Sequence, residues 1–135
     1  MSEALANTPD KLVAGLYLVA TPIGNSRDIT LRALDILRDA DVLVAEDTRT
    51  LRRLLEIHGV SVSGRPLISY NDHNGAGRRA QLLRHLKAGK SVALTSDAGT
   101  PGIADPGFAL ARAALAEGYK VEGAPGPTAA ISALI

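Results

Sequence analysis

Short apolar runs alternate with segments of helical periodicity along nearly the whole chain. Consecutive strands joined by helices pair in parallel, with the connecting helices packed on the faces of the sheet. The alternation therefore predicts an α/β fold with a mostly parallel five-stranded sheet and helices on both faces. The predicted strands are residues 16–20, 42–45, 66–70, 92–95 and 119–122. The predicted helices lie at 30–38, from about 50 to 58, at 76–88, at 105–117 and from about 127.

Leucines mark the buried stripe of the first three helices. Thr30 is the expected N-cap of the first helix, and Asp105-Pro106 is a typical helix start. The leucines expected to face the sheet are Leu31, Leu34 and Leu37, then Leu51, Leu54 and Leu55, then Leu82, Leu83 and Leu86.

A chain of 135 residues has the size of one domain. We expect a frayed tail at residues 1–14 and an N-terminal α/β domain at 15–135. The apolar run 129–135 lacks a helix stop signal, which favours a fragment whose second domain is missing. With no signal peptide and no apolar run near ~20 residues, the sequence predicts a cytoplasmic protein without a membrane span.

The composition of the chain excludes several kinds of functional site. The chain has no cysteine, which excludes disulfides and thiolate metal sites, and its histidines lack metal-ligand spacing, so we expect no metal. A net charge of +1 gives no overall basic field, and any contact with nucleic acid would depend on local clusters of arginine.

Loops rich in glycine and proline follow the first, fourth and fifth predicted strands, at residues 21–25, 96–107 and 123–128. Ligands of open α/β sheets bind outside the carboxyl ends of the strands, so these loops predict one site built mostly from main chain. The chain lacks the glycine patterns that bind dinucleotides or triphosphates. Asp97 and Asp105 would repel phosphate and suit a ligand with ribose hydroxyls and cationic centres, such as S-adenosylmethionine. Asp105 as a helix cap and Asp97 as part of an Asx turn remain alternatives.

The motifs also carry a family resemblance. Residues 94–107 (LTSDAGTPGIADPG), 18–25 (LVATPIGN), 45–49 (AEDTR) and 125–130 (PGPTAA) resemble, in order and spacing, bacterial methyltransferases of small-subunit ribosomal RNA. That family methylates a ribose 2′-hydroxyl and belongs to the tetrapyrrole methylase superfamily. The resemblance extends from Leu16 to Ile135. It departs from the family at Gly75, where that branch commonly has Glu, so a contact from that Glu is not expected here.

The resemblance implies S-adenosylmethionine bound in a folded conformation between two domains. Methyl transfer would be to the 2′-hydroxyl of a cytidine ribose in small-subunit ribosomal RNA, by a homodimer. Pro22 and Gly24 would flank the methionine end of the cofactor or the acceptor. The other expected cofactor contacts are Asp97, Gly99, Thr100, Pro101, Ile103, Ala104, Thr128 and Ala129.

Candidates for the base that accepts the hydroxyl proton are Glu46, Asp47 and His73. Capping of the next helix is the alternative for Asp47. Candidate RNA contacts are Arg49, Arg52 and Arg53, whose spacing places them on one helix face, where a solvated basic face is the alternative.

Two other functions stay open at this point. One is methylation of a tetrapyrrole, against which the first loop argues because it differs from the glycine-rich loop of those enzymes. The other is a nucleoside-binding or assembly module without catalysis.

Overall fold

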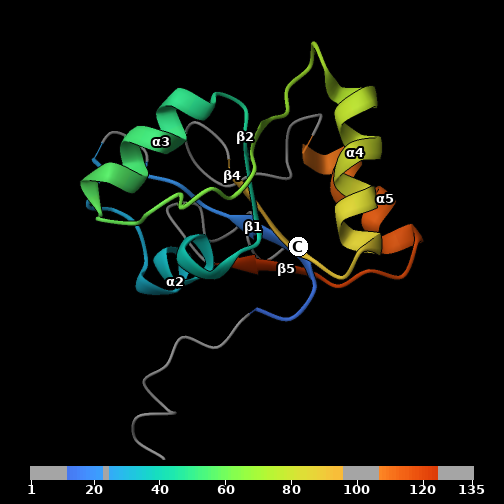
Figure 1. The fold of residues 1–135 in the computed structure, drawn as a ribbon, viewed down its shortest axis with the longest axis horizontal. Helices are drawn as coiled ribbons and strands as arrows, with labels where there is room; N and C mark the ends of the chain where they lie inside the picture. Colours follow the sequence, from blue (N-terminus) through green and yellow to red (C-terminus); the bar gives the residue numbers. More distant parts are fainter. Residues whose placement is uncertain (1–11, 23–24, 96–106, 125–135) are drawn as a thin grey trace, which may run out of the picture.

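Strands and helices alternate strictly in the computed structural model, which describes residues 12–22, 25–95 and 107–124 (Figure 1). The strands are β1 (Gly15–Val19), β2 (Val42–Ala45), β3 (Leu67–Ser69), β4 (Ser91–Thr95) and β5 (Val121–Ala124). The helices are α2 (Leu31–Asp39), α3 (Thr48–Ile57), α4 (Gly75–Lys87) and α5 (Gly107–Ala116).

The strands form one five-stranded sheet in the order β3-β2-β4-β1-β5, and every pair is parallel. The chain moves from β1 through β2 to the β3 edge, then returns through β4 to β5. Right-handed crossovers that reverse direction in this way must place their helices on opposite faces of the sheet. The predicted α/β class, with helices on both faces of a parallel sheet, is confirmed.

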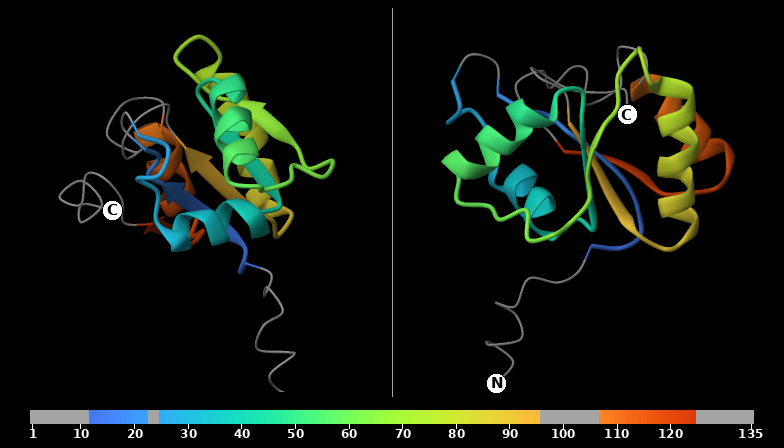
Figure 2. Two further views of the ribbon diagram at one scale, coloured as in Figure 1. Left: turned by 90° about the vertical axis from the view of Figure 1, so that its left-hand side faces the viewer. Right: turned by 45° about the horizontal axis from the view of Figure 1, so that its top comes forward.

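Side chains from alternate positions of the strands build the core on each face. On one face Tyr17 and Val19 of β1 pack with α2 and α3, and on the other Leu16 and Leu18 pack with α4 and α5. The two pairs of helices stand on opposite sides of the sheet in Figures 1 and 2. Strands buried on both faces explain why the sequence shows continuous apolar runs rather than alternation.

Two predicted core residues are wrong: Leu54 lines a pocket instead of joining the core, and Leu31 is exposed. Leu31 is 80% exposed, whereas the buried residues of α2 are Ala33, Ile36 and Leu37. Thr30 is the N-cap, as predicted, and its hydroxyl accepts a hydrogen bond from the Ala33 amide at 3.0 Å. Leu31 therefore lies in the first turn, directly after the cap, and its side chain does not reach the sheet.

Other boundaries differ by one or two residues from those predicted. Helix α3 begins at Thr48 rather than near Thr50, because Asp47 caps it. Strand β5 begins at Val121 rather than Tyr119, because the Tyr119 amide still donates to the Ala114 carbonyl at 2.9 Å and closes the end of α5. Strand β3 is shorter than predicted, and the tail and last helix fall largely or wholly outside the described residues.

Candidate functional site

The carboxyl ends of four strands lie side by side along one end of the sheet, called the carboxyl edge below. Val19 of β1 pairs with Thr95 of β4 and with Ala124 of β5, and Val44 of β2 pairs with Leu94. The segments that follow β1, β4 and β5 therefore start next to one another, as the sequence predicted. Most of each of the second and third loops, residues 96–106 and 125–128, lies outside the described residues.

At these carboxyl ends, the connections that follow neighbouring strands leave toward opposite faces of the sheet. Helices α2 and α3, which follow β1 and β2, cover one face, while α5, which follows β4, covers the other. Neighbouring strands whose connections leave in opposite directions open a crevice at their carboxyl ends, and α/β proteins bind ligands there.

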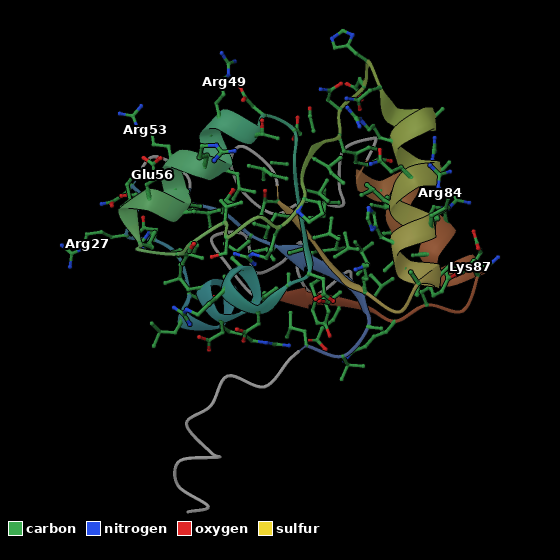
Figure 3. All side chains as sticks on the ribbon, in the orientation of Figure 1. Arg27, Arg49, Arg53, Glu56, Arg84 and Lys87 are labelled. Atoms are coloured by element: carbon green, nitrogen blue, oxygen red, sulfur yellow. The ribbon has the colours of Figure 1, made fainter. Side chains whose placement is uncertain are left out.

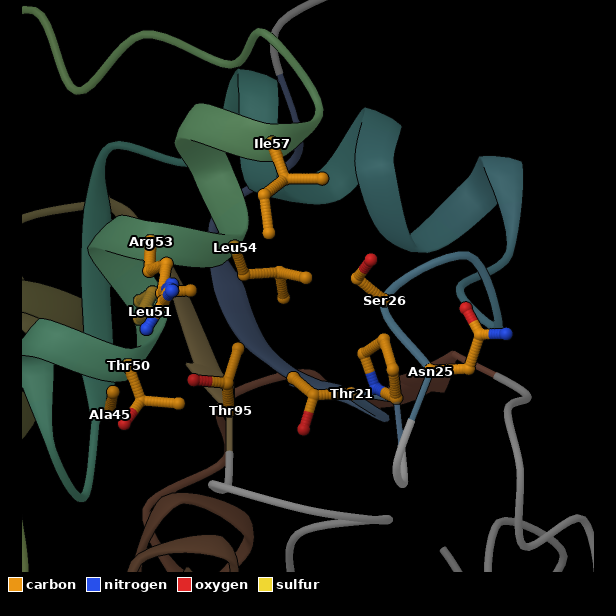
Figure 4. A pocket seen from close by; sticks show the side chains of 11 residues that line it. Thr21, Asn25, Ser26, Ala45, Thr50, Leu51, Arg53, Leu54, Ile57 and Thr95 are labelled. Carbon is orange, nitrogen blue, oxygen red and sulfur yellow. The ribbon is translucent and has the colours of Figure 1, made fainter.

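A pocket of about 260 Å³ lies at the carboxyl edge, on the α2–α3 face (Figure 4). Its floor is formed by Ala45 and Thr95 at the ends of β2 and β4, and by Thr21 just after β1. These small side chains leave open the volume that a leucine would fill. The Thr95 hydroxyl donates to the Val44 carbonyl at 3.1 Å, so this hydroxyl hydrogen is used within the sheet.

Helix α3 forms one wall of the pocket. Thr50, Leu54 and Ile57, spaced by four and three residues, lie on one stripe of this helix and line the pocket. Leu51 and Leu55, one position along, belong to the core, and Leu51 also reaches the pocket. Helix α3 thus uses one stripe to hold itself on the sheet and the adjacent stripe to border the pocket.

The opposite wall is the segment between β1 and α2, to which Pro22, Asn25 and Ser26 contribute. A histidine ties the two walls together: His58, the C-cap of α3, places its Nε2 2.7 Å from the Ser26 carbonyl oxygen. This contact fixes the width of the pocket at the Ile57 end.

The sequence profile of one family, described as Tetrapyrrole (Corrin/Porphyrin) Methylases, matches residues 15–135. The chain belongs to the tetrapyrrole methylase family. This confirms the superfamily predicted from the motifs of the strand-end loops.

Curated relatives are identical to the chain at about half of the aligned residues. Ribosomal RNA small subunit methyltransferase I of Synechocystis is 51% identical over 120 residues, 89% of this chain and 42% of the relative. The protein of the same name from Mesorhizobium japonicum is 48% identical, over 91% of this chain and 41% of the relative. The chain thus spans about two fifths of the length of these relatives.

A solved structure has the same fold. The uroporphyrin III C-methyl transferase of Thermus thermophilus matches with a TM-score of 0.63 and 24% identity, over 89% of this chain and 52% of that one. At this identity the similarity concerns the fold.

The structure describes only part of the predicted cofactor site. Pro22 is half-buried and lines the pocket. The remaining predicted contacts lie outside the described residues and stay predictions. They are Gly24, Asp97, Gly99, Thr100, Pro101, Ile103, Ala104, Thr128 and Ala129.

Of the candidate bases, Glu46 and Asp47 lie between β2 and α3, next to the pocket residues Ala45 and Thr50. The Asp47 carboxylate accepts a bond from the Arg49 amide at 2.9 Å and pairs with the Arg49 guanidinium at 2.9 Å. The side-chain bond from Arg49 is the main cause that lowers the pKa of Asp47. A lowered pKa makes this carboxylate a weaker proton acceptor. The geometry thus favours the alternative role that the sequence left open for Asp47, as a helix cap.

Replacing Asp47 by asparagine separates the two roles. Asparagine caps helices as well as aspartate does, so we expect the melting temperature to stay within a few degrees and methyl transfer to fall less than about tenfold. Loss of a general base would instead lower the rate by about 10²- to 10⁴-fold. A loss of that size, with the fold intact, would show that Asp47 accepts the proton.

The third candidate base, His73, lies on another part of the carboxyl edge. It follows β3, and its amide donates to the Asn71 side chain at 2.9 Å. With Arg78 and Gln81 it borders a shallow depression at the start of α4, separate from the pocket residues described above. The assignment of the base among Glu46, Asp47 and His73 stays a prediction.

The candidate RNA contacts Arg49, Arg52 and Arg53 are all exposed on α3, as their spacing predicted. Figure 3 shows Arg49 and Arg53 pointing outward from α3, on the same side of the molecule as Arg27. Arg53 also lines the pocket. Glu56 lies among these arginines and reduces the positive charge of the surface.

Within residues 12–22, 25–95 and 107–124, no group of three or more acidic, histidine or cysteine side chains could hold a metal ion. No helix in the same ranges combines the length and hydrophobicity that crossing a bilayer requires.

Sequence reasoning missed the α3 wall of the pocket and the floor residue Thr95. A signal was present: Ile57 continues an apolar stripe from Leu54 that does not coincide with the core stripe of Leu51 and Leu55. A second apolar stripe on a short helix indicates a second surface to cover or a pocket wall.

Proposed function

We propose that the chain is the N-terminal part of an S-adenosylmethionine-dependent methyltransferase that modifies the 2′-hydroxyl of a cytidine ribose in small-subunit ribosomal RNA. The observation that carries this proposal is the 51% identity, over 89% of the chain, to a relative named ribosomal RNA small subunit methyltransferase I. The tetrapyrrole acceptor is less well supported, because its representative is similar at 24% identity and shares the fold alone.

The position of the strand ends supports a cofactor site at the carboxyl edge. The predicted contacts of the long loop follow Thr95 directly, and those of the last loop follow Ala124. Both of these residues pair with Val19, so the two loops leave from strands on either side of β1. Main-chain groups from such loops can surround a nucleoside. This arrangement supports S-adenosylmethionine as the cofactor, which when bound supplies an activated methyl group on a sulfonium.

The task of the protein in such a transfer is placement. The ribose hydroxyl has to lie about 3–3.5 Å from the methyl carbon, in line with the bond that breaks. The pocket beside β1 would hold the acceptor in this alignment. Glu46 or His73 would take the hydroxyl proton, both being exposed at the carboxyl edge of the sheet.

Contacts with RNA phosphates would come from the arginines of α3, Arg49, Arg52 and Arg53. The salt dependence of RNA binding by variants that lack these arginines tests this role.

Because the chain spans 42% of its relative, we propose that sequence beyond Ile135 completes the cofactor site as a second domain. We also propose that the enzyme is a homodimer and acts in the cytoplasm, where its ribosomal substrate is assembled. Sedimentation of the complete protein tests the dimer, and cell fractionation tests its location.

The decisive experiment follows a labelled methyl group. The chain and a longer version continuing past Ile135 are incubated with labelled S-adenosylmethionine and small ribosomal subunits from cells lacking the endogenous enzyme. We expect the longer version to label one cytidine ribose at its 2′-oxygen, and the short chain to bind the cofactor weakly, as calorimetry would show. Labelling of a uroporphyrinogen or precorrin acceptor in place of RNA would support the tetrapyrrole alternative. Absence of cofactor binding by either version would support a module without catalysis.

A further inference from the structure

The pocket on the α2–α3 face has a chemistry of its own, apart from the glycine-rich loops. Its walls are mainly apolar, with Leu51, Leu54 and Ile57 on one side and Pro22 on the other. At the floor, the Thr95 hydroxyl is turned toward β2 and bonded to the Val44 carbonyl, so the methyl group is left to face the pocket. Such walls suit the faces of a flat ring better than a charged or strongly hydrated group.

The charge of the pocket argues against the cationic end of the cofactor. Among the described residues that line it, Arg53 is the only one with a formal charge, and no carboxylate lines it. A sulfonium or ammonium group would be repelled by Arg53, whereas a phosphate would be attracted to it. An apolar slot with one arginine at its mouth matches a base and its adjacent phosphate.

The volume also limits the occupant. Drug-sized ligands fill pockets of about 300–1,000 Å³, and this one measures about 260 Å³. A single nucleobase with part of its sugar fits such a space. The polar groups of Thr50, Asn25 and Ser26 at the rim can bond to the edges of a base.

We propose that this pocket holds the unstacked base of the acceptor nucleotide, with Arg53 on a neighbouring phosphate. Proteins read single-stranded RNA by splaying bases out of the stack, and enzymes extrude a nucleotide to reach an atom that is otherwise inaccessible. Seating the base against α3 would hold the attached ribose at the carboxyl ends of β1 and β4, beside the predicted cofactor loops. The inference rests on the proposed function and assigns it a subsite for the substrate base.

Filling the pocket tests the proposal. In the variant Ile57→Trp, an indole would occupy the space next to Leu54. Ile57 is 56% exposed, so the change should leave the fold intact. The matched control is Leu31→Trp, which enlarges another aliphatic side chain on a helix, 80% exposed and outside the pocket lining. Equal melting temperatures of the two variants would verify that both are folded.

Two measurements on the longer version, each made with both variants, decide the outcome. We expect Ile57→Trp to lower kcat/KM for small ribosomal subunits by about 10- to 100-fold, because the base would lose its burial against the apolar walls. Binding of S-adenosylmethionine by calorimetry should stay within about twofold, and Leu31→Trp should change neither. Loss of cofactor binding in Ile57→Trp would assign the pocket to the cofactor, and unchanged methyl transfer would show that the pocket is not used. Either result overturns the proposal.

A separate measurement keeps the test independent of the proposed function. Cytidine 5′-monophosphate is titrated into the 135-residue chain and followed by amide chemical shifts. We expect shifts at Thr50, Leu54 and Ser26 that disappear in Ile57→Trp and persist in Leu31→Trp. If the longer version transfers no methyl group to RNA, the proposed function fails, and the titration still decides the pocket. Absence of shifts at these amides overturns the base subsite.

Discussion

Replacing Gly15 by alanine is expected to lower the free energy of unfolding by about 3 kcal/mol. Gly15 begins β1 with a φ of +154°, a backbone conformation that residues with a Cβ rarely adopt. An added Cβ would lie 2.9 Å from the Lys120 carbonyl oxygen and 3.0 Å from the Lys120 Cβ. That oxygen already accepts a bond from the Leu16 amide at 2.8 Å, so it cannot move away without weakening the β1–β5 ladder.

Gly118 supplies the matched control. It has a φ of +83°, and an added Cβ there would meet no other atom within 4 Å. Gly118→Ala therefore carries the backbone cost alone, about 1 kcal/mol. Urea denaturation of both variants separates the two contributions. Equal destabilisation would mean that the contact with Lys120 costs nothing and that β5 can shift to accommodate a methyl group.

Replacing Arg65 by methionine is expected to cost about 3 kcal/mol, because this side chain joins two segments of backbone. Its NH1 group donates to the Leu37 and Ala40 carbonyls at 2.7 and 2.8 Å, at the end of α2. Its Nε donates to the Val62 carbonyl at 3.0 Å, and NH2 donates to Ser61 in the same loop. A cation at a helix C-terminus is also favoured by the helix dipole.

The variant Arg65→Lys tests whether the shape of the guanidinium matters or only its charge. An ammonium keeps the charge but cannot reproduce the planar set of donors, so we expect it to recover less than half of the lost stability. Guanidinium chloride denaturation of both variants measures this difference. A lysine variant as stable as the original protein would show that charge at the end of α2 is sufficient, and that the bonds to the loop add little.

The elements of this fold could be predicted because the central strands β1, β2 and β4 are buried on both faces. Runs such as 42–45 and 92–94 are continuously apolar for that reason, and the helices between them carry regular leucines. Leu31 was placed wrongly because periodicity describes the direction of a side chain and not how far the sheet extends beneath it. Sequence order also cannot reveal that β4 inserts between β2 and β1, since this depends on contacts between distant segments.

The candidate site was predictable to a similar extent. The loops that follow β1, β4 and β5 were recognised from glycine and proline, and the parallel sheet brings their starting points together. The pocket wall was not recognised, because Ile57 and Thr95 are ordinary residues whose role depends on which strand adjoins which helix. Asp47 was ambiguous because a carboxylate after a strand serves equally as a cap or as a base, and only its bonds to Arg49 distinguish the two.

The order β3-β2-β4-β1-β5 has a consequence for biosynthesis. Both neighbours of β1 are encoded in the last third of the 135 residues, so the first strand leaves the ribosome long before any partner exists for it. Until translation has passed Thr95, the apolar segment 16–20 has no hydrogen-bonded neighbour to pair with. Such late pairing of distant segments makes folding slow and leaves the nascent chain open to aggregation. During that interval a chaperone has a defined segment to shield.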